Sequence, residues 1–399
     1  GVSYASDREY SAKIQLYPLN VGYNLVLAVE RSGATADYAE TSAGFKFKSK
    51  ATHPAASREV YVIVVGETAR ACSFSLYGYG RETTPLLERT PGLVAYTDVL
   101  TQSNTTHKSV PMLLSAACAE DYDRIYREKG IITAFKEAGF HTVFISNQRP
   151  NRSFIDFFGM EADEWVFMKE NHKGTETLQD ADMLPMVKDV LAQGRKKELI
   201  VLHTYGSHFN YRERYAARTA VFKPDNASEA KPSNRESLVN AYDNSIRSTD
   251  SFLHGLIGIV DSCGAVSALL YTSDHGENIF DDRRQLFLHA SPVPSFYELH
   301  VPFVIWTSDS YRRTFAPVAA ALDANRRKSV ASSVSVFHTM LGLAGIETPY
   351  RNDSLSVASG KFTPTRRMYL NDHNEPVPVD KILRDKEDFV MMERVKAGQ

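Results

Sequence analysis

Short apolar runs alternate with helix-spaced segments along most of this chain of 399 residues. Helical spacing of apolar residues occurs near residues 107–118, 130–139, 178–195, 234–260 and 329–345. The apolar runs between these segments have the length and composition of buried strands: EVYVIVVGE (59–67), LVAYTDVL (93–100), HTVFISN (141–147), ELIVLHT (198–204), VSALLYTSD (266–274) and VPFVIWTS (301–308). The alternation predicts an α/β fold with a parallel or mostly parallel central sheet and helices on both faces.

Composition limits the classes of function. Hydrophobic residues at 43% and charged residues at 24% are ordinary for a globular domain. With 46 basic and 48 acidic residues the net charge is −2, so we expect no nucleic-acid partner. The three cysteines lack CxxC spacing, which excludes a cysteine-rich zinc finger and allows at most one disulfide. No run of eighteen apolar residues predicts a membrane-spanning helix.

The first 57 residues differ from the rest. Tyr4, Tyr10, Tyr17 and Tyr23 are amphipathic rings that favour either a water–lipid boundary or an arm packed on the domain. The segment GFKFKSKATHPAAS, at 44–57, has the composition of a polar linker. We therefore predict an N-terminal arm and linker over 1–57 and a single catalytic domain over 58–399.

Polar side chains follow three of the predicted strands. Glu67 follows EVYVIVVG, His203 closes ELIVLH, and Asp274 with His275 follows VSALLYTS. Sites in open parallel sheets lie beyond the carboxyl ends of the strands, so these residues are expected at one edge. A buried carboxylate needs a cation or several donors; an arginine such as Arg70 could serve Glu67, but the neighbouring imidazole favours a metal.

Thr106 lies in a Ser-Asn-Thr-Thr run where a helix is predicted to begin. A hydroxyl there is close to free backbone N–H groups, which favours binding of a phosphate. Ser103 or Thr105 are equally suited to capping the helix, and spacing alone does not decide among them.

Seven segments in order resemble motifs of the bacterial phosphoethanolamine transferases, the family that includes the lipid A-modifying and colistin-resistance enzymes. They are VVGETARACSFSLYGYGRETTP, TTHKSVP, LHTYGSHFNYRERY, AYDNSIRSTDSFL, TSDHGEN, LHAS and ELHVPFVIW. The resemblance covers roughly residues 59 to 345. It implies the α/β/α sandwich of the alkaline phosphatase and sulfatase superfamily.

The resemblance also implies residue roles. Glu67, Thr106, Asp274 and His275 match the positions that hold a catalytic zinc, and Thr106 matches the nucleophile that becomes phosphoethanolamine-modified. His208 and His289 match groups that assist as phosphate or second-metal ligands. We expect one zinc, with a second left open. Weaker candidates for the site, each with a structural alternative, are His107, Lys108, His203 and His300.

The implied reaction transfers phosphoethanolamine from phosphatidylethanolamine, through Thr106, to an envelope acceptor: lipid A, a core sugar, a glycan or a protein. Family members normally carry an N-terminal transmembrane domain, so the chain resembles a catalytic part, expected as a monomer at the periplasmic face of the bacterial inner membrane. Alternatives are a phosphodiesterase or glycerol-phosphate transferase of the superfamily, or a non-catalytic metal- or glycan-binding module. A sulfatase reaction is disfavoured because SNTTHKSVP lacks a C/S-x-P-x-R sequence.

Three departures leave the acceptor open. Cysteines that usually flank the nucleophile segment in lipid A enzymes are replaced, as by Ser103. The segment FISNQRPNRSF replaces the cysteine-rich loop on the acceptor side, and His107 with Lys108 stands where small or aromatic residues are commoner.

Overall fold

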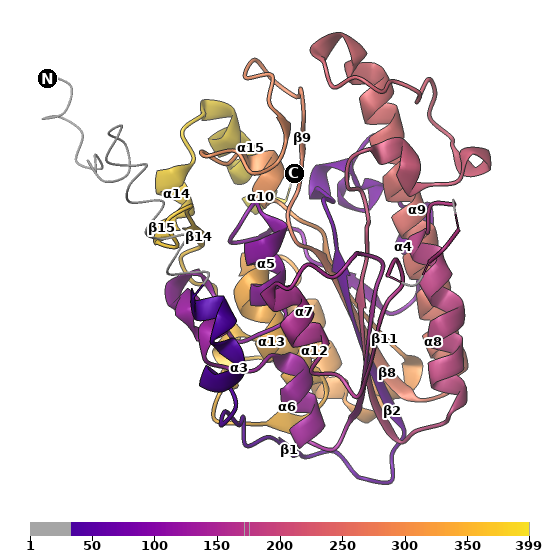
Figure 1. The fold of residues 1–399 in the computed structure, drawn as a ribbon, viewed down its shortest axis with the longest axis vertical. Helices are drawn as coiled ribbons and strands as arrows, with labels where there is room; N and C mark the ends of the chain where they lie inside the picture. The colour runs from indigo at the N-terminus through magenta and orange to yellow at the C-terminus, as the bar shows by residue number, and fades with distance from the viewer. Residues whose placement is uncertain (1–32, 171, 175, 399) are drawn as a thin grey trace, which may run out of the picture.

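A seven-stranded mixed sheet forms the centre of the computed structural model, which describes residues 33–170, 172–174 and 176–398 (Figure 1). The strand order is β3-β11-β8-β2-β7-β5-β6. The strands are β2 (Glu59–Gly66), β3 (Leu93–Ala95), β5 (His141–Ser146), β6 (Glu164–Phe167), β7 (Lys197–His203), β8 (Val266–Ser273) and β11 (Phe303–Thr307). Five strands run parallel, from β8 through β6, and β11 pairs antiparallel with both β8 and β3. The predicted mostly parallel sheet is confirmed.

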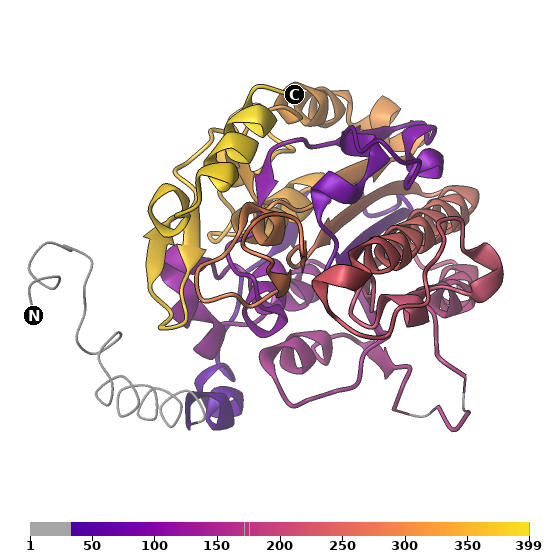
Figure 2. The same ribbon diagram turned by 90° about the horizontal axis from the view of Figure 1, so that it is seen from above.

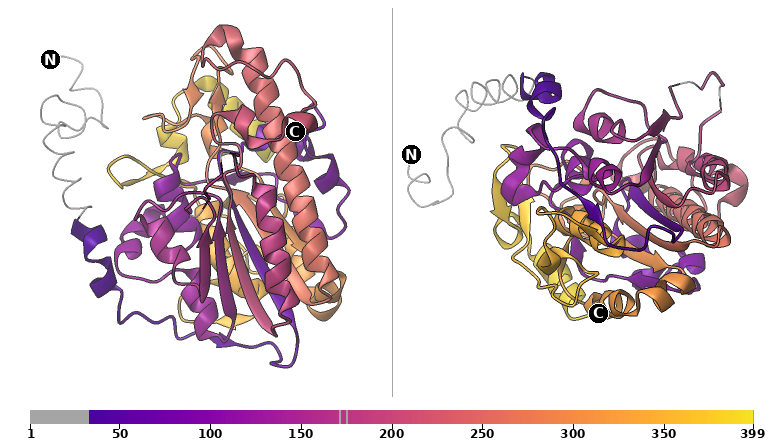
Figure 3. Two further views of the ribbon diagram at one scale, coloured as in Figure 1. Left: turned by 45° about the vertical axis from the view of Figure 1, so that its right-hand side comes forward. Right: turned by 90° about the horizontal axis from the view of Figure 1, so that it is seen from below.

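Helices cover both faces of the sheet, and Figure 1 shows α8 and α9 on one side with α5, α6, α7 and α13 on the other. The left view of Figure 3 shows the twisted sheet between these two layers. The larger helices are α5 (Thr106–Leu113), α6 (Ile131–Glu137), α7 (Phe154–Gly159), α8 (Met183–Ala192), α9 (Arg235–Ser262), α11 (Asp309–Thr314), α12 (Ala316–Asn325), α13 (Ser332–Leu343) and α15 (Lys386–Lys396). The single-turn helices are α3 (Tyr38–Thr41), α4 (Pro85–Glu88), α10 (Phe296–Leu299) and α14 (Val379–Ile382).

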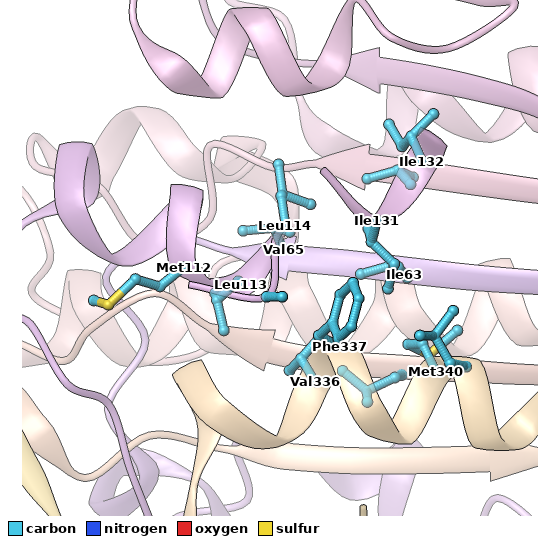
Figure 4. Packing of buried hydrophobic residues seen from close by; sticks show 14 of the residues in the cluster. Ile63, Val65, Met112, Leu113, Leu114, Ile131, Ile132, Val336, Phe337 and Met340 are labelled. Carbon is cyan, nitrogen blue, oxygen red and sulfur yellow. The ribbon is translucent and has the colours of Figure 1, made fainter. Parts of the chain in front are cut away.

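Strand β2 is buried along its whole length and divides the core in two. Its side chains alternate between the faces, because successive residues of a strand point to opposite sides. Tyr61, Ile63 and Val65 join one cluster, and Val60 with Val62 joins the other. Figure 4 shows Ile63 and Val65 beside residues of α5, α6 and α13, including Ile131 and Phe337. This packing fixes the carboxyl end of β2 relative to α5.

Four short strand pairs lie outside the main sheet: β1 (Lys50–Ala51) with β13 (Ile346–Glu347), β4 (Val99–Leu100) with β12 (Val330–Ala331), β9 (Asn278–Ile279) with β10 (Phe287–Leu288), and β14 (Met368–Leu370) with β15 (Pro376–Pro378). The predicted strand over 93–100 is therefore two strands, β3 and β4, in different sheets. The C-terminal elements, yellow in Figure 2, lie along the flank of the domain, where α15 contacts α10.

Residues 33–57 pack on the domain rather than extending from it as a polar linker would. Phe47 is fully buried, Tyr38 is 5% exposed, and Lys50–Ala51 pairs with β13. The domain division between residues 57 and 58 stays a prediction, although Tyr38 and Phe47 upstream of it are buried. Tyr4, Tyr10, Tyr17 and Tyr23 lie outside the described residues.

Candidate active site

The central strands bring the predicted site residues to one edge of the sheet. Strands β2 and β8 are parallel neighbours, and Gly66, the last residue of β2, pairs with Ser273, the last of β8. Glu67 and Asp274 therefore follow at the same level, where the Asp274 amide donates to the Gly66 carbonyl at 3.0 Å. His203 ends β7 on the other side of β2. Parallel pairing alone explains why residues two hundred positions apart meet.

Glu67, Asp274 and His275 form a buried group, called here the acidic cluster, in which one ligand atom of each residue lies within 4.8 Å of the others. His275 Nε2 is 3.5 Å from Glu67 Oε1 and 3.3 Å from Asp274 Oδ2. The other oxygen of Asp274 accepts from the backbone amides of Thr68, at 3.0 Å, and His275, at 2.7 Å. These bonds fix the carboxylate and leave Oδ2 facing the cluster.

The Thr106 hydroxyl lies at the same cluster. It donates to Glu67 Oε1 at 3.1 Å and is also 3.1 Å from His275 Nε2. Thr106 is the first residue of α5, and Thr105 is its N-cap without a side-chain capping bond. Ser103 Oγ is 3.1 Å from Thr105 Oγ1. The three hydroxyls, which spacing could not rank, are therefore separated by position: only Thr106 contacts the acidic cluster.

The electrostatics of the cluster fit a divalent cation. Among the described residues, Asp274 Oδ2 is buried without a hydrogen-bond partner, so its desolvation is incompletely offset. Burial, followed by the charge of Glu67, raises the pKa of Asp274 well above its ordinary value. Two carboxylates, an imidazole and a hydroxyl are ligand types that zinc accepts in four-coordinate sites. The residues present therefore fit the zinc that the sequence implies.

His289 lies beside the cluster, with its ring centroid 4.0 Å from that of His275. Its Nδ1 is 2.9 Å from Oε1 of the fully buried Glu277, and Tyr211 donates to the other oxygen of Glu277 at 2.8 Å. A carboxylate at Nδ1 orients the ring and leaves Nε2 available. Glu277 was not among the predicted site residues, although it lies within TSDHGEN, three residues beyond Asp274.

His208 lies near Glu67. Its ring stacks on Tyr205 at a centroid distance of 4.9 Å, and its Nδ1 is 2.6 Å from the Phe209 carbonyl. The amide of the preceding residue, Ser207, donates to the Glu67 carbonyl at 2.9 Å. Burial raises the pKa of Glu67, but the charges of His275 and then of His208 lower it, and the net shift is downward.

Gln148 is a site residue that sequence analysis did not single out. Its amide donates to Glu67 Oε2 at 3.1 Å and to the Thr204 carbonyl at 2.8 Å. It also lies 3.1 Å from Nε2 of His203, whose Nδ1 is 3.1 Å from Ser146 Oγ. Burial lowers the pKa of His203 to about 4, so this histidine is a neutral group that supports Gln148. The available signal was position: Gln148 follows β5 at the same edge of the sheet.

The remaining candidates contact other parts of the chain. Lys108 Nζ donates to the Asn371 carbonyl at 2.8 Å, and His107 is exposed on α5. His300 Nε2 is 2.9 Å from the Thr97 carbonyl, and its ring stacks on Phe296. These contacts do not bring Lys108 or His300 to the acidic cluster.

Gly276, directly after His275, stands where the chain has no room for a side chain. A Cβ there would lie 2.0 Å from the Tyr297 carbonyl oxygen, so the position excludes a side chain by contact.

The three cysteines are free thiols. Within the described ranges, none of the helices combines the length and apolarity needed to cross a bilayer.

The sequence profile described as Sulfatase matches residues 59–346, which is more than half of the chain. The chain belongs to the sulfatase family. The match begins with β2 and ends at β13, so it contains every residue of the acidic cluster together with Thr106, His208 and His289.

Curated relatives within this family share moderate identity with the chain. Phosphoethanolamine transferase EptC of Escherichia coli is 28% identical over 331 residues, covering 80% of this chain and 56% of that protein. The Kdo(2)-lipid A phosphoethanolamine 7''-transferase of Escherichia coli is 28% identical over 313 residues, covering 73% of this chain and 52% of that protein. The chain spans about half the length of the curated relatives it matches.

Solved structures of the same sulfatase-family fold agree. The C-terminal periplasmic domain of EptC from Escherichia coli, in complex with Zn, superimposes with a TM-score of 0.76 at 24% identity, covering 85% of this chain and 97% of that one. The soluble domain of lipooligosaccharide phosphoethanolamine transferase A from Neisseria meningitidis gives a TM-score of 0.71 at 26% identity, covering 79% and 97%. The α/β fold is therefore the one found in these two phosphoethanolamine transferase domains.

Proposed function

We propose that the chain is the catalytic domain of a zinc-dependent phosphoethanolamine transferase. One observation carries the proposal: the Thr106 hydroxyl contacts both Glu67 and His275 at a buried cluster that fits a divalent cation. The named activity of EptC and the zinc in the structure of its periplasmic domain support it. Glu67, Asp274, His275 and Thr106 would hold the zinc, which when bound supplies a Lewis acid that favours the threonine alkoxide.

The chain's own residues account for the first half of the reaction. Thr106 Oγ1 forms a bond to the phosphorus of phosphatidylethanolamine, and the bond from phosphorus to the glycerol oxygen breaks. The hydroxyl proton is directed at Glu67 Oε1 and ends on the glycerol oxygen, so that diacylglycerol leaves as a neutral alcohol. His289 lies against His275, and His208 follows Ser207, whose amide donates to the Glu67 carbonyl; ring N–H groups of both histidines would stabilise the negative phosphoryl oxygens.

The second half returns the enzyme to its starting state. An oxygen of the acceptor attacks the phosphorus of the phosphoethanolamine-threonine, the bond to Thr106 Oγ1 breaks, and Thr106 regains its proton. Gln148 holds Glu67 in place throughout. We place this reaction at the periplasmic face of the inner membrane, as the periplasmic domains of EptC and the membrane-bound EptA suggest. Water as the acceptor would instead give a phosphodiesterase.

Intact-protein mass spectrometry tests the proposal. After incubation with phosphatidylethanolamine vesicles, the wild-type domain should gain the mass of one phosphoethanolamine, and Thr106→Ala should not. Thr105→Ala is the matched control, because the neighbouring hydroxyl bonds to Ser103 instead of the cluster and should leave the adduct unchanged. Zinc content, measured by elemental analysis, should persist in both variants. An adduct that survives in Thr106→Ala would contradict the proposed nucleophile.

A further inference from the structure

A second group of charged residues gathers around Tyr205, two residues beyond the end of β7. Lys169 Nζ lies 3.3 Å from the centroid of the Tyr205 ring, and Arg214 Cζ lies 4.1 Å from it. Lys169 is half-buried and the Arg214 side chain is only 5% exposed. Both cations are attracted by the ring electrons, which holds them near one another despite their like charge.

The positive charge of this group is incompletely balanced. Lys169 and Arg214 share one ring, and the positive charge of Arg149 also acts on Lys169. Burial and then the charge of Arg214 lower the pKa of Lys169 to about 8, as expected for an ammonium group that lacks a full counter-charge. An anion between these side chains would remove the repulsion.

The nearby carboxylates are engaged elsewhere. Asp180 accepts from the backbone amides of Tyr205 at 2.8 Å and Gly206 at 2.9 Å, and from the Asn147 side chain at 2.9 Å. Glu213 pairs with Arg214, but its side chain is 57% exposed, so solvent weakens the attraction. Neither carboxylate therefore fully neutralises Lys169 and Arg214.

The group adjoins the proposed nucleophile. Tyr205 stacks on His208, and the Ser207 amide donates to the Glu67 carbonyl at 2.9 Å. Glu67 in turn accepts from Thr106. An anion held by Lys169 and Arg214 therefore lies beside the reacting centre without displacing any residue of the acidic cluster.

We propose that Lys169 and Arg214 bind an oxyanion, a phosphate or carboxylate, carried by the acceptor. The proposal rests on the transferase function assigned above. The donor is a poor occupant, because its phosphate must lie at Thr106 to react and its ethanolamine amine is positively charged. An anionic group of the acceptor is attracted by these two cations, whereas the ethanolamine amine of the donor is repelled. The cluster thus selects anionic acceptors for the second half of the reaction.

Binding of inorganic phosphate and of acetate to chelator-treated protein tests the site independently of transfer. Without a metal the acidic cluster is negative and repels anions, so calorimetry reports on the cations around Tyr205. We expect wild-type protein to bind at least one of the two anions and Lys169→Gln to bind it about tenfold more weakly, because one charge-assisted bond is lost. Lys188→Gln, at an exposed position on α8, is the matched control and should bind as wild type does. Equal affinities in Lys169→Gln and wild type, or no binding of either anion by wild type, would overturn the proposal.

A discharge experiment separates this proposal from the transferase function. Protein carrying the Thr106 adduct is mixed with glucose 1-phosphate or with glucose, and loss of the adduct mass is followed. We expect the phosphorylated sugar to discharge the adduct at lower concentration, and Lys169→Gln to raise its half-saturating concentration about tenfold without slowing adduct formation. If wild type forms no adduct, the transferase function fails while the binding test still decides the anion site. Equal discharge by the two sugars contradicts acceptor selection.

Discussion

At the scale of single residues, Gln148 connects Glu67 with His203 and Thr204 at the end of β7. Its amide donates to Glu67 Oε2 and to the Thr204 carbonyl, so Glu67 has one oxygen fixed and the other directed at Thr106 and His275. Groups that orient metal ligands in this way typically affect metal affinity by about 10- to 100-fold. We expect Gln148→Leu to lower zinc affinity within that range, measured by competition with a chromophoric chelator.

Two controls sharpen this prediction. Gln193→Leu changes an exposed glutamine at the end of α8 and should leave zinc affinity unchanged. Circular dichroism of Gln148→Leu should remain that of the wild type, because the residue is only partly buried. Unchanged zinc affinity in Gln148→Leu would mean that Glu67 is positioned by the strand end alone.

Gly206 illustrates a close backbone approach that a side chain would prevent. Its φ is +51°, and an added Cβ would lie 2.5 Å from the Glu67 carbonyl oxygen. Gly206→Ala should destabilise the fold by roughly 1–3 kcal/mol and weaken zinc binding, because the loop must move away from Glu67. Gly194→Ala is the control. Its φ is also positive, at +67°, but an added Cβ there would have no atom within 4 Å. Urea unfolding and zinc titration of both variants separate backbone strain from contact; equal zinc affinities would show that the contact does not matter.

Single residues show how far the sequence could predict the site. Glu67, Asp274 and His275 could be found because each stands directly after a recognisable buried strand. Gln148 and Glu277 could not be identified as site residues from the sequence, because their roles come from contacts with Glu67 and His289 that only the fold creates. His203 and His300 are polar residues at strand boundaries like the others, and only burial with local partners distinguishes them.

At the scale of elements, the segment before β2 is held by aromatic packing. The Phe47 ring lies within 5.6 Å, between centroids, of those of Phe45, Phe337 and Tyr350. The Phe47 amide also donates to Glu137 of α6 at 2.8 Å. We expect Phe47→Ala to reduce the free energy of unfolding by about 3–5 kcal/mol, as for other fully buried phenylalanines.

Urea denaturation checks this expectation, and Lys46→Ala on the same segment is the control because its side chain is exposed. If Phe47→Ala unfolds at the wild-type urea concentration, the segment before residue 58 is a dispensable arm, as the sequence alone suggested. A large loss would place the folding boundary upstream of Phe47.

Elements with continuous apolar runs were predictable, and those defined by tertiary partners were not. The runs that became β2, β7 and β8 are buried on both faces, which leaves a strong pattern in the sequence. Strand β6 was not predicted, because this edge strand, EWVF, exposes Glu164 and Trp165. The run over 93–100 was predicted as one strand, yet β3 pairs with β11 and β4 with β12, a division that only the partners determine.

At the scale of the whole molecule, buried histidines link stability to pH. His300 and His338 are each 6% exposed, and burial lowers the pKa of both from 6.5 to about 4. In the unfolded chain they titrate near 6.5, so between these values the unfolded state binds protons that the folded state does not. Stability is therefore lost as pH falls from about 6.5 to about 4, by up to about 3 kcal/mol for each histidine.

Replacing one of these histidines should flatten that dependence. His338 Nδ1 accepts from the Asn352 amide at 3.0 Å, so His338→Gln removes the titrating ring while keeping a polar side chain. The variant should be less stable than wild type at neutral pH, yet lose about 1–2 kcal/mol less between pH 7 and pH 5, because its unfolded state no longer gains that proton. Urea titrations at the two pH values measure the difference directly. His172→Gln, at an exposed histidine, should retain the wild-type dependence. A variant that keeps the full wild-type loss would show that His338 is protonated equally in both states and that other groups set the acid limit of the fold.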